Sequence, residues 1–312
     1  MEVDEVTSVK YWDDISGEEL DPELVQQARK EEMKQFVKHN VYVKVPVEEC
    51  FRVTGQPSVG TRWVDINKGD VKNPEYRSRL VAQELKTDKR EDLLAATPPL
   101  KALKLLFVMF AVTKVSTKGT EMGLMFLDIV RAYFHALAKR DVYVRLPEED
   151  YEEGMCGKLV KAMYGTRDAA MNWEAAYVKV FEDMGFRRGL SNPCIFHHED
   201  REVRGVVHGD DLTLLGPVDE LEWVKGNIMK VMTVKEKAVL TRNKPGKVRI
   251  LNRIVEVTAL GLEYEADQRH AEIIMRTLGL KSDSKPPGTS IKSEGRSSDT
   301  MKDDSMYRAI AA

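Results

Sequence analysis

The sequence lacks long apolar runs and lacks the features of a secreted chain. Its longest purely apolar stretch, residues 105–112, has eight residues, whereas a helix that crosses a bilayer needs about 20. The first five residues, Met-Glu-Val-Asp-Glu, are acidic and contain no apolar segment of the kind found in a signal peptide. The sequence therefore excludes a transmembrane helix and predicts no secretory signal.

Cysteine is also scarce. The three cysteines, Cys50, Cys156 and Cys194, are spaced too widely for a disulfide framework or a zinc knuckle. We therefore expect an intracellular, reducing environment. Cys194 lies close in sequence to His197 and His198, but this group lacks a fourth ligand, which argues against a zinc site.

Basic residues are not in surplus. The 48 Lys and Arg residues are outnumbered by 51 Asp and Glu residues, which gives a net charge of −3. A nucleic-acid role must therefore depend on a local basic patch. With 42% hydrophobic residues among 312, the chain can bury a core and has roughly two domain-lengths, or one domain with subdomains.

The periodicity of apolar residues predicts alternating helices and strands. Between residues 124 and 232 the order is strand, helix, strand, hairpin and helix, which is typical of an α+β unit with an antiparallel sheet and helices on one face. A second hairpin, with a tip that is basic on one face, is expected over 62–82. The predicted helices are 22–38, 100–112, 168–184 and 217–232, and the predicted strands are 41–47, 62–67, 76–82, 124–127, 195–196, 203–208 and 212–215.

Acidic residues stand at the ends of three apolar strands. Asp128 ends one strand, and Asp210 and Asp211 lie in a turn between two others. If these strands are neighbours, the carboxylates meet at one sheet edge, where a pair of divalent cations would relieve their repulsion. Such a pair, about 4 Å apart, supports phosphoryl transfer. Ordinary turn chemistry and a loop start explain the same residues without a metal, and both interpretations stay open on spacing alone.

The segments that carry these acids resemble the reverse transcriptase of copia-type LTR retrotransposons. The resemblance extends from about residue 41 to about residue 285, and the order of its motifs is specific. Phe126–His135 resembles the first palm motif of the family, in which an aromatic residue follows an aspartate by five positions. Val207–Leu212 resembles the Asp-Asp box of the family. Further matching segments are 76–82 (fingers hairpin), 142–147, 164–173 (the Tyr-Gly…Trp block) and 264–270 (primer grip and thumb).

This resemblance implies a right-hand polymerase fold with fingers, palm and thumb around an antiparallel palm sheet. We expect an N-terminal leader helix region at 1–40, fingers at 41–120 and a palm at 121–235, with part of the fingers at 148–165. A thumb-like region is expected at 236–285. The remaining residues, 286–312, are expected to be a linker and the truncated start of a next segment.

The resemblance also assigns roles to single residues. Asp128, Asp210 and Asp211, with the Ile129 backbone, would hold two Mg²⁺ ions, with Mn²⁺ as an alternative. Arg77 and Arg79 would bind the phosphates of the incoming dNTP, a task that suits the planar guanidinium. A solvated hairpin face is the alternative for the two arginines.

Aromatic residues receive roles from the resemblance and from helical spacing. Tyr133 would be a steric gate against the ribose 2′-hydroxyl, and its alternative is a core aromatic beneath the sheet. Trp173 and Tyr177 lie on a helical apolar stripe, and we expect them in the core rather than stacked on bases.

Two positions depart from the family pattern. His208 opens the Asp-Asp box where an aromatic residue is usual, and Asp168 stands where glutamine is usual. An aspartate there would repel phosphate, and Arg167 beside it is expected to neutralise that charge and to contact the dNTP. These departures leave the three acids intact and put the nucleotide pocket in doubt.

The implied function is RNA-directed DNA polymerase, with an RNA template, a DNA or tRNA primer and dNTPs as partners and no membrane. The implied location is intracellular, in a cytoplasmic virus-like particle with a nuclear stage also allowed, and the oligomeric state is left open. The main alternative is an inactive, truncated remnant that binds nucleic acid without polymerising. A metal-dependent nuclease would also use three acids, but it would not account for the fingers hairpin or the aromatic gate.

Overall fold

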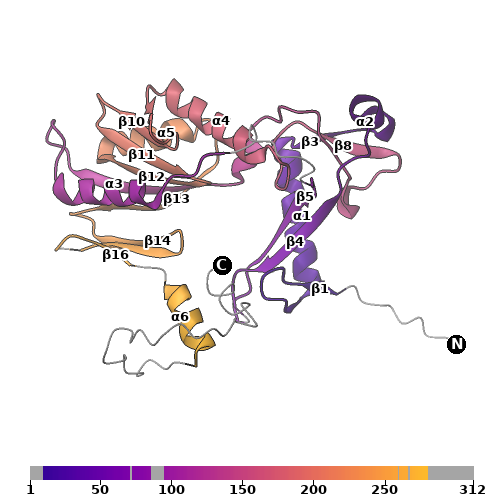
Figure 1. Cartoon of the computed structure of the whole chain (residues 1–312), viewed down its shortest axis with the longest axis horizontal. Coiled ribbons are helices and arrows are strands. Elements are labelled where there is room, and N and C mark those ends of the chain that lie inside the picture. The colour runs from indigo at the N-terminus through magenta and orange to yellow at the C-terminus, as the bar shows by residue number, and fades with distance from the viewer. Residues whose placement is uncertain (1–9, 71, 86–94, 259, 266–267, 280–312) are drawn as a thin grey trace, which may run out of the picture. The chain divides into compact units, whose positions relative to one another are not determined.

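The computed structural model describes residues 10–70, 72–85, 95–258, 260–265 and 268–279 (Figure 1). The chain divides into two compact units, residues 1–239 and 240–312. The expected linker and next segment at 286–312, and residues 266–267 of the expected primer grip, lie outside the described residues. No helix in the described ranges is both long and apolar enough to cross a membrane.

A six-stranded sheet carries the acid-bearing strands. Its order is β13 (Val234–Thr241), β6 (Met122–Ile129), β12 (Asp211–Pro217), β11 (Val203–His208), β10 (Ile195–His198) and β9 (Arg187–Arg188). The pairs from β6 through β12, β11 and β10 to β9 are all antiparallel. The predicted antiparallel sheet is confirmed, and so is the α+β class.

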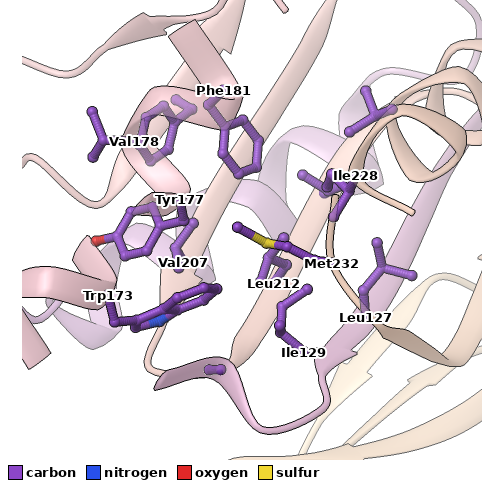
Figure 2. Close-up of a cluster of buried hydrophobic side chains, with 14 of the residues drawn as sticks. Leu127, Ile129, Trp173, Tyr177, Val178, Phe181, Val207, Leu212, Ile228 and Met232 are labelled. Atoms are coloured by element: carbon purple, nitrogen blue, oxygen red, sulfur yellow. The ribbon is translucent and has the colours of Figure 1, made fainter. Parts of the chain in front are cut away.

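Helices cover both faces of this sheet (Figure 1). Helices α4 (Ala169–Asp183) and α5 (Val218–Ile228) pack on one face, and α3 (Leu100–Val112) contacts β6, β11 and β12 from the other. Because side chains alternate along a strand, every second residue of β6 faces α4 and α5. Figure 2 shows the resulting cluster, in which Leu127 and Ile129 lie with Trp173, Tyr177 and Phe181. The predicted core placement of Trp173 and Tyr177 is confirmed.

The first unit also contains helix α1 (Pro22–His39) and smaller sheets. Asp21 caps α1, because its carboxylate accepts hydrogen bonds from two first-turn N–H groups, and Asn40 ends the helix in the left-handed conformation. The helix packs against β5 (Tyr76–Ala82), which pairs with β4 (Thr61–Asn67) in the predicted hairpin. Short strands β1 (Tyr11–Trp12) and β2 (Glu19–Leu20) pair beside it.

A three-stranded sheet joins distant segments of the first unit. Its order is β3 (Tyr42–Pro46), β8 (Met155–Leu159) and β7 (Tyr143–Val144), all antiparallel. Residues of the 148–165 segment therefore pair with residues of the 41–120 segment. The names fingers, palm and thumb for the ranges given above remain predictions.

The second unit contains β14 (Gly246–Ile250), β15 (Arg253–Val257), β16 (Leu262–Tyr264) and α6 (Gln268–Thr277). The three strands form an antiparallel sheet, in which Val255 and Val257 are buried. None of these elements was predicted individually. Helix α2 (Val47–Thr54) was also not predicted, because its eight residues are too few to establish a helical repeat.

Candidate active site

The three predicted acids meet at one end of the six-stranded sheet. Asp128, near the end of β6, is directly opposite Asp211, the first residue of β12. Residues directly opposite each other in an antiparallel pair project from the same face. Gly209 and Asp210 form the two-residue loop between β11 and β12, so Asp210 lies at the same end of the sheet as Asp211. The predicted contact between the acid-bearing strands is confirmed.

The turn that carries Asp210 is held by hydrogen bonds on two sides. Gly209 has a φ of +64°, a conformation that glycine adopts without strain. The Trp173 indole N–H donates to the Gly209 carbonyl at 2.8 Å, and the Ile129 N–H donates to the Asp210 carbonyl at 2.8 Å. The Ile129 side chain is 1% exposed and lies in the cluster of Figure 2. Core packing therefore fixes the position of the acidic turn.

One lysine bridges two of the carboxylates. The Lys237 ammonium, on β13, lies 3.1 Å from Asp128 Oδ1 and also contacts Asp211 Oδ1. Burial raises the pKa of Asp211 above its usual value, and the nearby charges of Asp210 and Asp128 add to this, although Lys237 opposes it. Burial would lower the pKa of Lys237, but its contacts with Asp211 and Asp128 raise it. The acids therefore attract a cation.

The donor set fits hard divalent cations. Within the described residues no three His, Cys, Asp or Glu side chains are already arranged around a metal position, and Lys237 lies between Asp128 and Asp211 instead. The Lys237 ammonium therefore occupies a position in which the carboxylate oxygens of Asp128 and Asp211 bind a cation. Carboxylate oxygens are the ligands that Mg²⁺ prefers, so Asp128, Asp210 and Asp211 suit Mg²⁺ once Lys237 moves aside.

A cavity of about 380 Å³ opens beside the acids, within the usual range for a small-molecule site. Six basic and four acidic side chains line it, so that the surplus positive charge faces a strongly acidic corner. The lining residues are Glu32, Lys68, Arg77, Arg79, Asp128, Ile129, Val130, Arg131, Tyr164, Asp210, Asp211, Lys235 and Lys237. The arrangement suits an anionic ligand that also binds cations.

The structure brings Arg77 and Arg79 to this cavity. They are opposite Ile66 and Val64 in the β4–β5 hairpin, and the Arg79 guanidinium lies 5.0 Å from the centre of the Tyr164 ring. Burial lowers the pKa of the neighbouring Lys68, and the charges of Arg77 and Arg79 lower it further. This concentration of positive charge favours phosphate binding. Both arginines line the cavity, as the dNTP-binding interpretation requires, although their role stays a prediction.

Tyr133 and Arg167 are not among the residues that line the cavity. Tyr133, in the short 3₁₀ helix η2 (Ala132–His135), is half-buried, and its ring centre is 4.8 Å from that of Tyr164. Burial raises the pKa of Tyr133, and the nearby Asp210 charge adds to this. The backbone N–H of Arg167 donates a hydrogen bond to Glu84 Oε2 at 2.8 Å. Both dNTP roles remain predictions.

Asp168 is buried and paired with Arg140. Arg140 donates to Asp168 Oδ1 at 2.7 Å and also to Glu84, and the Asn172 amide donates to Asp168 Oδ2 at 2.8 Å. Asp168 does not line the cavity. The expectation that it repels phosphate from the nucleotide pocket is therefore wrong, because its carboxylate is turned into a structural network. Arg140, which the sequence analysis did not single out, is its ion-pair partner.

Replacing Asp168 by alanine is expected to lower the free energy of unfolding by about 1–3 kcal/mol at pH 7, because Arg140 and Asn172 lose a buried acceptor. Burial alone would raise the pKa of Asp168, but hydrogen bonds from Arg140 and Asn172 hold it below its ordinary value of 3.8. The contribution of Asp168 is therefore fully present above about pH 4 and is lost as the pH falls further. Urea denaturation at several pH values measures it.

The matched control is Asp183→Ala. Asp183 pairs with Lys179 at 3.0 Å, but both side chains are exposed, so its removal is expected to cost no more than about 0.5 kcal/mol. If Asp168→Ala and Asp183→Ala changed stability equally, or if the Asp168→Ala difference were independent of pH, the network would have no such role.

Sequence reasoning missed several cavity residues. Glu32, Lys68, Arg131, Tyr164, Lys235 and Lys237 line the cavity without having been predicted as site residues. Glu32 could have been found, because it interrupts the apolar face of α1, where Val25 and Phe36 are buried. Lys237 gave no local signal, since it faces the acids only through the pairing of β13 with β6.

Known proteins are similar to parts of this chain. A Pol polyprotein from the Nicotiana tabacum transposon TNT 1-94, described as retrovirus-related, is 23% identical over 218 residues, which cover 67% of this chain and 16% of that protein. A solved foamy viral protease–reverse transcriptase, in complex with double-stranded DNA, is 12% identical to this chain, with a TM-score of 0.42. The matched region covers 83% of this chain and 37% of the foamy viral chain.

The family match covers most of the first unit. Residues 48–244, more than half of the chain, match the reverse transcriptase (RNA-dependent DNA polymerase) family. The matched range includes Asp128, Asp210 and Asp211 together with both cavity arginines, and it confirms the resemblance drawn from the sequence motifs. The chain therefore belongs to the reverse transcriptase family.

Proposed function

We propose that this chain is the polymerase segment of a retrotransposon Pol polyprotein and that it adds deoxynucleotides to a primer 3′-hydroxyl on an RNA template. One observation carries the proposal: Asp128, Asp210 and Asp211 line the same cavity as a group of basic side chains. This combination suits a substrate with a triphosphate and two cations. The chain spans 16% of the length of its transposon relative.

The roles of the residues follow from their positions. Asp128, Asp210 and Asp211 would hold two Mg²⁺ ions, or Mn²⁺, which when bound help to activate the attacking hydroxyl and stabilise the leaving oxygen. Arg77, Arg79 and Lys68 supply charge for the phosphates. Little covalent chemistry is required of the protein, because positioning and charge neutralisation account for most of the catalysis of phosphoryl transfer.

The partners of the proposed activity are an RNA template, a DNA or tRNA primer and dNTPs. The chain has a net charge of −3, so its contacts with the template must come from local basic groups such as those of the β4–β5 hairpin. A cytoplasmic virus-like particle, with a nuclear stage, is the location that this function would require.

A second candidate function is that of an inactive remnant that binds nucleic acid. Lys237 specifically favours it, because its ammonium pairs with Asp128 and Asp211 and must leave before these oxygens can accept divalent cations. The active polymerase would synthesise DNA and the inactive remnant would not, whereas both would bind the template.

Primer extension on an RNA template separates them. We expect the wild-type chain to extend a primer with dNTPs and Mg²⁺, and we expect chelation of the metal to abolish synthesis and leave template binding, measured by fluorescence anisotropy, nearly unchanged. A DNA template and a template without primer are the controls. Template binding without extension at any Mg²⁺ or Mn²⁺ concentration would support the remnant instead.

A further inference from the structure

An acidic residue from outside the family match reaches the cavity. Glu32 belongs to α1, whereas the match begins at residue 48. Its side chain is among those that line the cavity beside the acids, and the residue is only 3% exposed. A buried carboxylate is costly unless it is paired, so its position requires a partner.

That partner is Arg131, three residues after Asp128. The Arg131 Nε and one terminal guanidinium nitrogen each lie 3.0 Å from Glu32 Oε2. The other oxygen, Oε1, is buried and accepts no hydrogen bond within the described part of the chain. Burial raises the pKa of Glu32 above its usual value, although the positive charges of Arg131, Arg79 and Arg77 act to lower it. The carboxylate thus lies where three arginines converge at the cavity.

Arg131 also has an unusual backbone. Its φ and ψ are 53° and 51°, the left-handed region, directly before η2. This conformation is unfavourable for a residue with a side chain and persists where surrounding contacts fix it. The turn that it forms joins Asp128 and Ile129 to Tyr133, so its shape sets where one wall of the cavity lies.

The contact between α1 and this turn is reinforced by packing. Phe134, the second residue after Ala132 in η2, packs edge-on against Phe36 of α1, with ring centres 4.9 Å apart. Phe36 is one helical turn after Glu32, so the two side chains lie on the same face of α1. An apolar contact and an ion pair therefore act together on the turn.

We propose that Glu32 is a positioning residue for the incoming nucleotide, because it holds Arg131 and fixes the 129–132 turn against which the triphosphate lies. This inference deepens the proposed function and depends on it. It also makes α1, outside the family match, a working part of the site. Glu32 itself does not touch the reacting atoms.

The test is nucleotide binding by the full chain. We expect Glu32→Ala to raise the Kd of dTTP, measured calorimetrically with Mg²⁺, by about 10-fold to 100-fold, the size of effect seen when a group that orients a metal ligand is removed. In primer extension, KM for dTTP should rise in parallel while kcat changes less, a split that general destabilisation would not produce. Glu32→Gln, which keeps the shape and an acceptor oxygen, should give a smaller rise.

Two controls isolate the mechanism. Glu31→Gln changes the adjacent, exposed carboxylate, which pairs with Lys34, and should leave the Kd unchanged. If Glu32 acts through Arg131, the effect of Glu32→Gln should disappear in an Arg131→Gln background, because residues in contact are not additive. Melting temperatures identify any variant that fails to fold.

The outcomes distinguish the two proposals. If the wild type binds dTTP and the folded Glu32→Gln and Glu32→Ala variants bind it equally well, the positioning role is overturned and the proposed function stands. An additive double variant would likewise overturn the route through Arg131. If the wild type itself does not bind dTTP with Mg²⁺ or Mn²⁺, the proposed function fails, and the positioning role fails with it.

Discussion

Replacement of Asp128 or Asp210 by asparagine is expected to abolish RNA-templated synthesis by this chain, with a loss of at least about 10³-fold in rate. Asparagine keeps the size of the side chain and removes the anionic oxygen that a divalent cation requires. Asp128 and Asp211 face each other across two strands, and Asp210 follows in the turn. The other carboxylate in the described lining of the cavity, that of Glu32, is held by Arg131 and replaces neither of them.

Template binding should survive the same substitutions. Duplex affinity comes mostly from Lys and Arg contacts to phosphate, and the removal of a negative charge cannot weaken those contacts. The matched control is Asp219→Asn on α5, an exposed residue, which should leave both activities unchanged. Full primer extension by Asp210→Asn would refute the assignment of the acids.

The fold could be predicted from the sequence where a periodic pattern of apolar residues or a helix cap gives a local signal. The 62–82 hairpin and the helix starting at Pro22 agree with the structure, because alternating apolar residues and an Asp21 cap are local signals. The β14–β15 hairpin was not predicted, because its loop is Leu251-Asn252, with φ of 45° and 60°. Such a turn is normally signalled by Asn-Gly, and a leucine there gives no indication of it. The right-hand polymerase fold came from the family resemblance.

The candidate site was predictable only along single strands. Asp128, Asp210 and Asp211 were noted as acids at the ends of apolar strands, and the family resemblance then assigned them a metal-binding role. The pairing of β6 with β12 places Asp128 opposite Asp211. Other contacts come from residues far away in the sequence. Lys237 contacts Asp128, Glu32 contacts Arg131, and Arg140 contacts Asp168. Nothing in their local sequence specifies those contacts. For the same reason the burial of Asp168 could not be anticipated.

Tyr133→Ala is expected to raise the incorporation of ribonucleotides relative to deoxynucleotides. The Tyr133 ring lies against that of Tyr164, which lines the cavity, and it is close enough to Asp210 for the carboxylate charge to act on its hydroxyl. A ring at this place would admit hydrogen at C2′ and clash with a hydroxyl. The discrimination is then steric, and it should fail when the ring is removed and persist in Tyr133→Phe.

A core role for Tyr133 predicts a different result. The residue packs partly against the cluster of Figure 2, and truncation of a fully buried large aromatic costs about 3–5 kcal/mol. Destabilisation lowers both activities equally, because it reduces the amount of folded enzyme. The ratio of kcat/KM for the two sugars is insensitive to that amount and reports differential transition-state binding. Tyr177→Ala, which removes a core aromatic that is 5% exposed, is the control and should leave the ratio unchanged. If Tyr133→Ala likewise lowered the melting temperature at a constant ratio, Tyr133 would be a core residue and the sugar would be selected elsewhere.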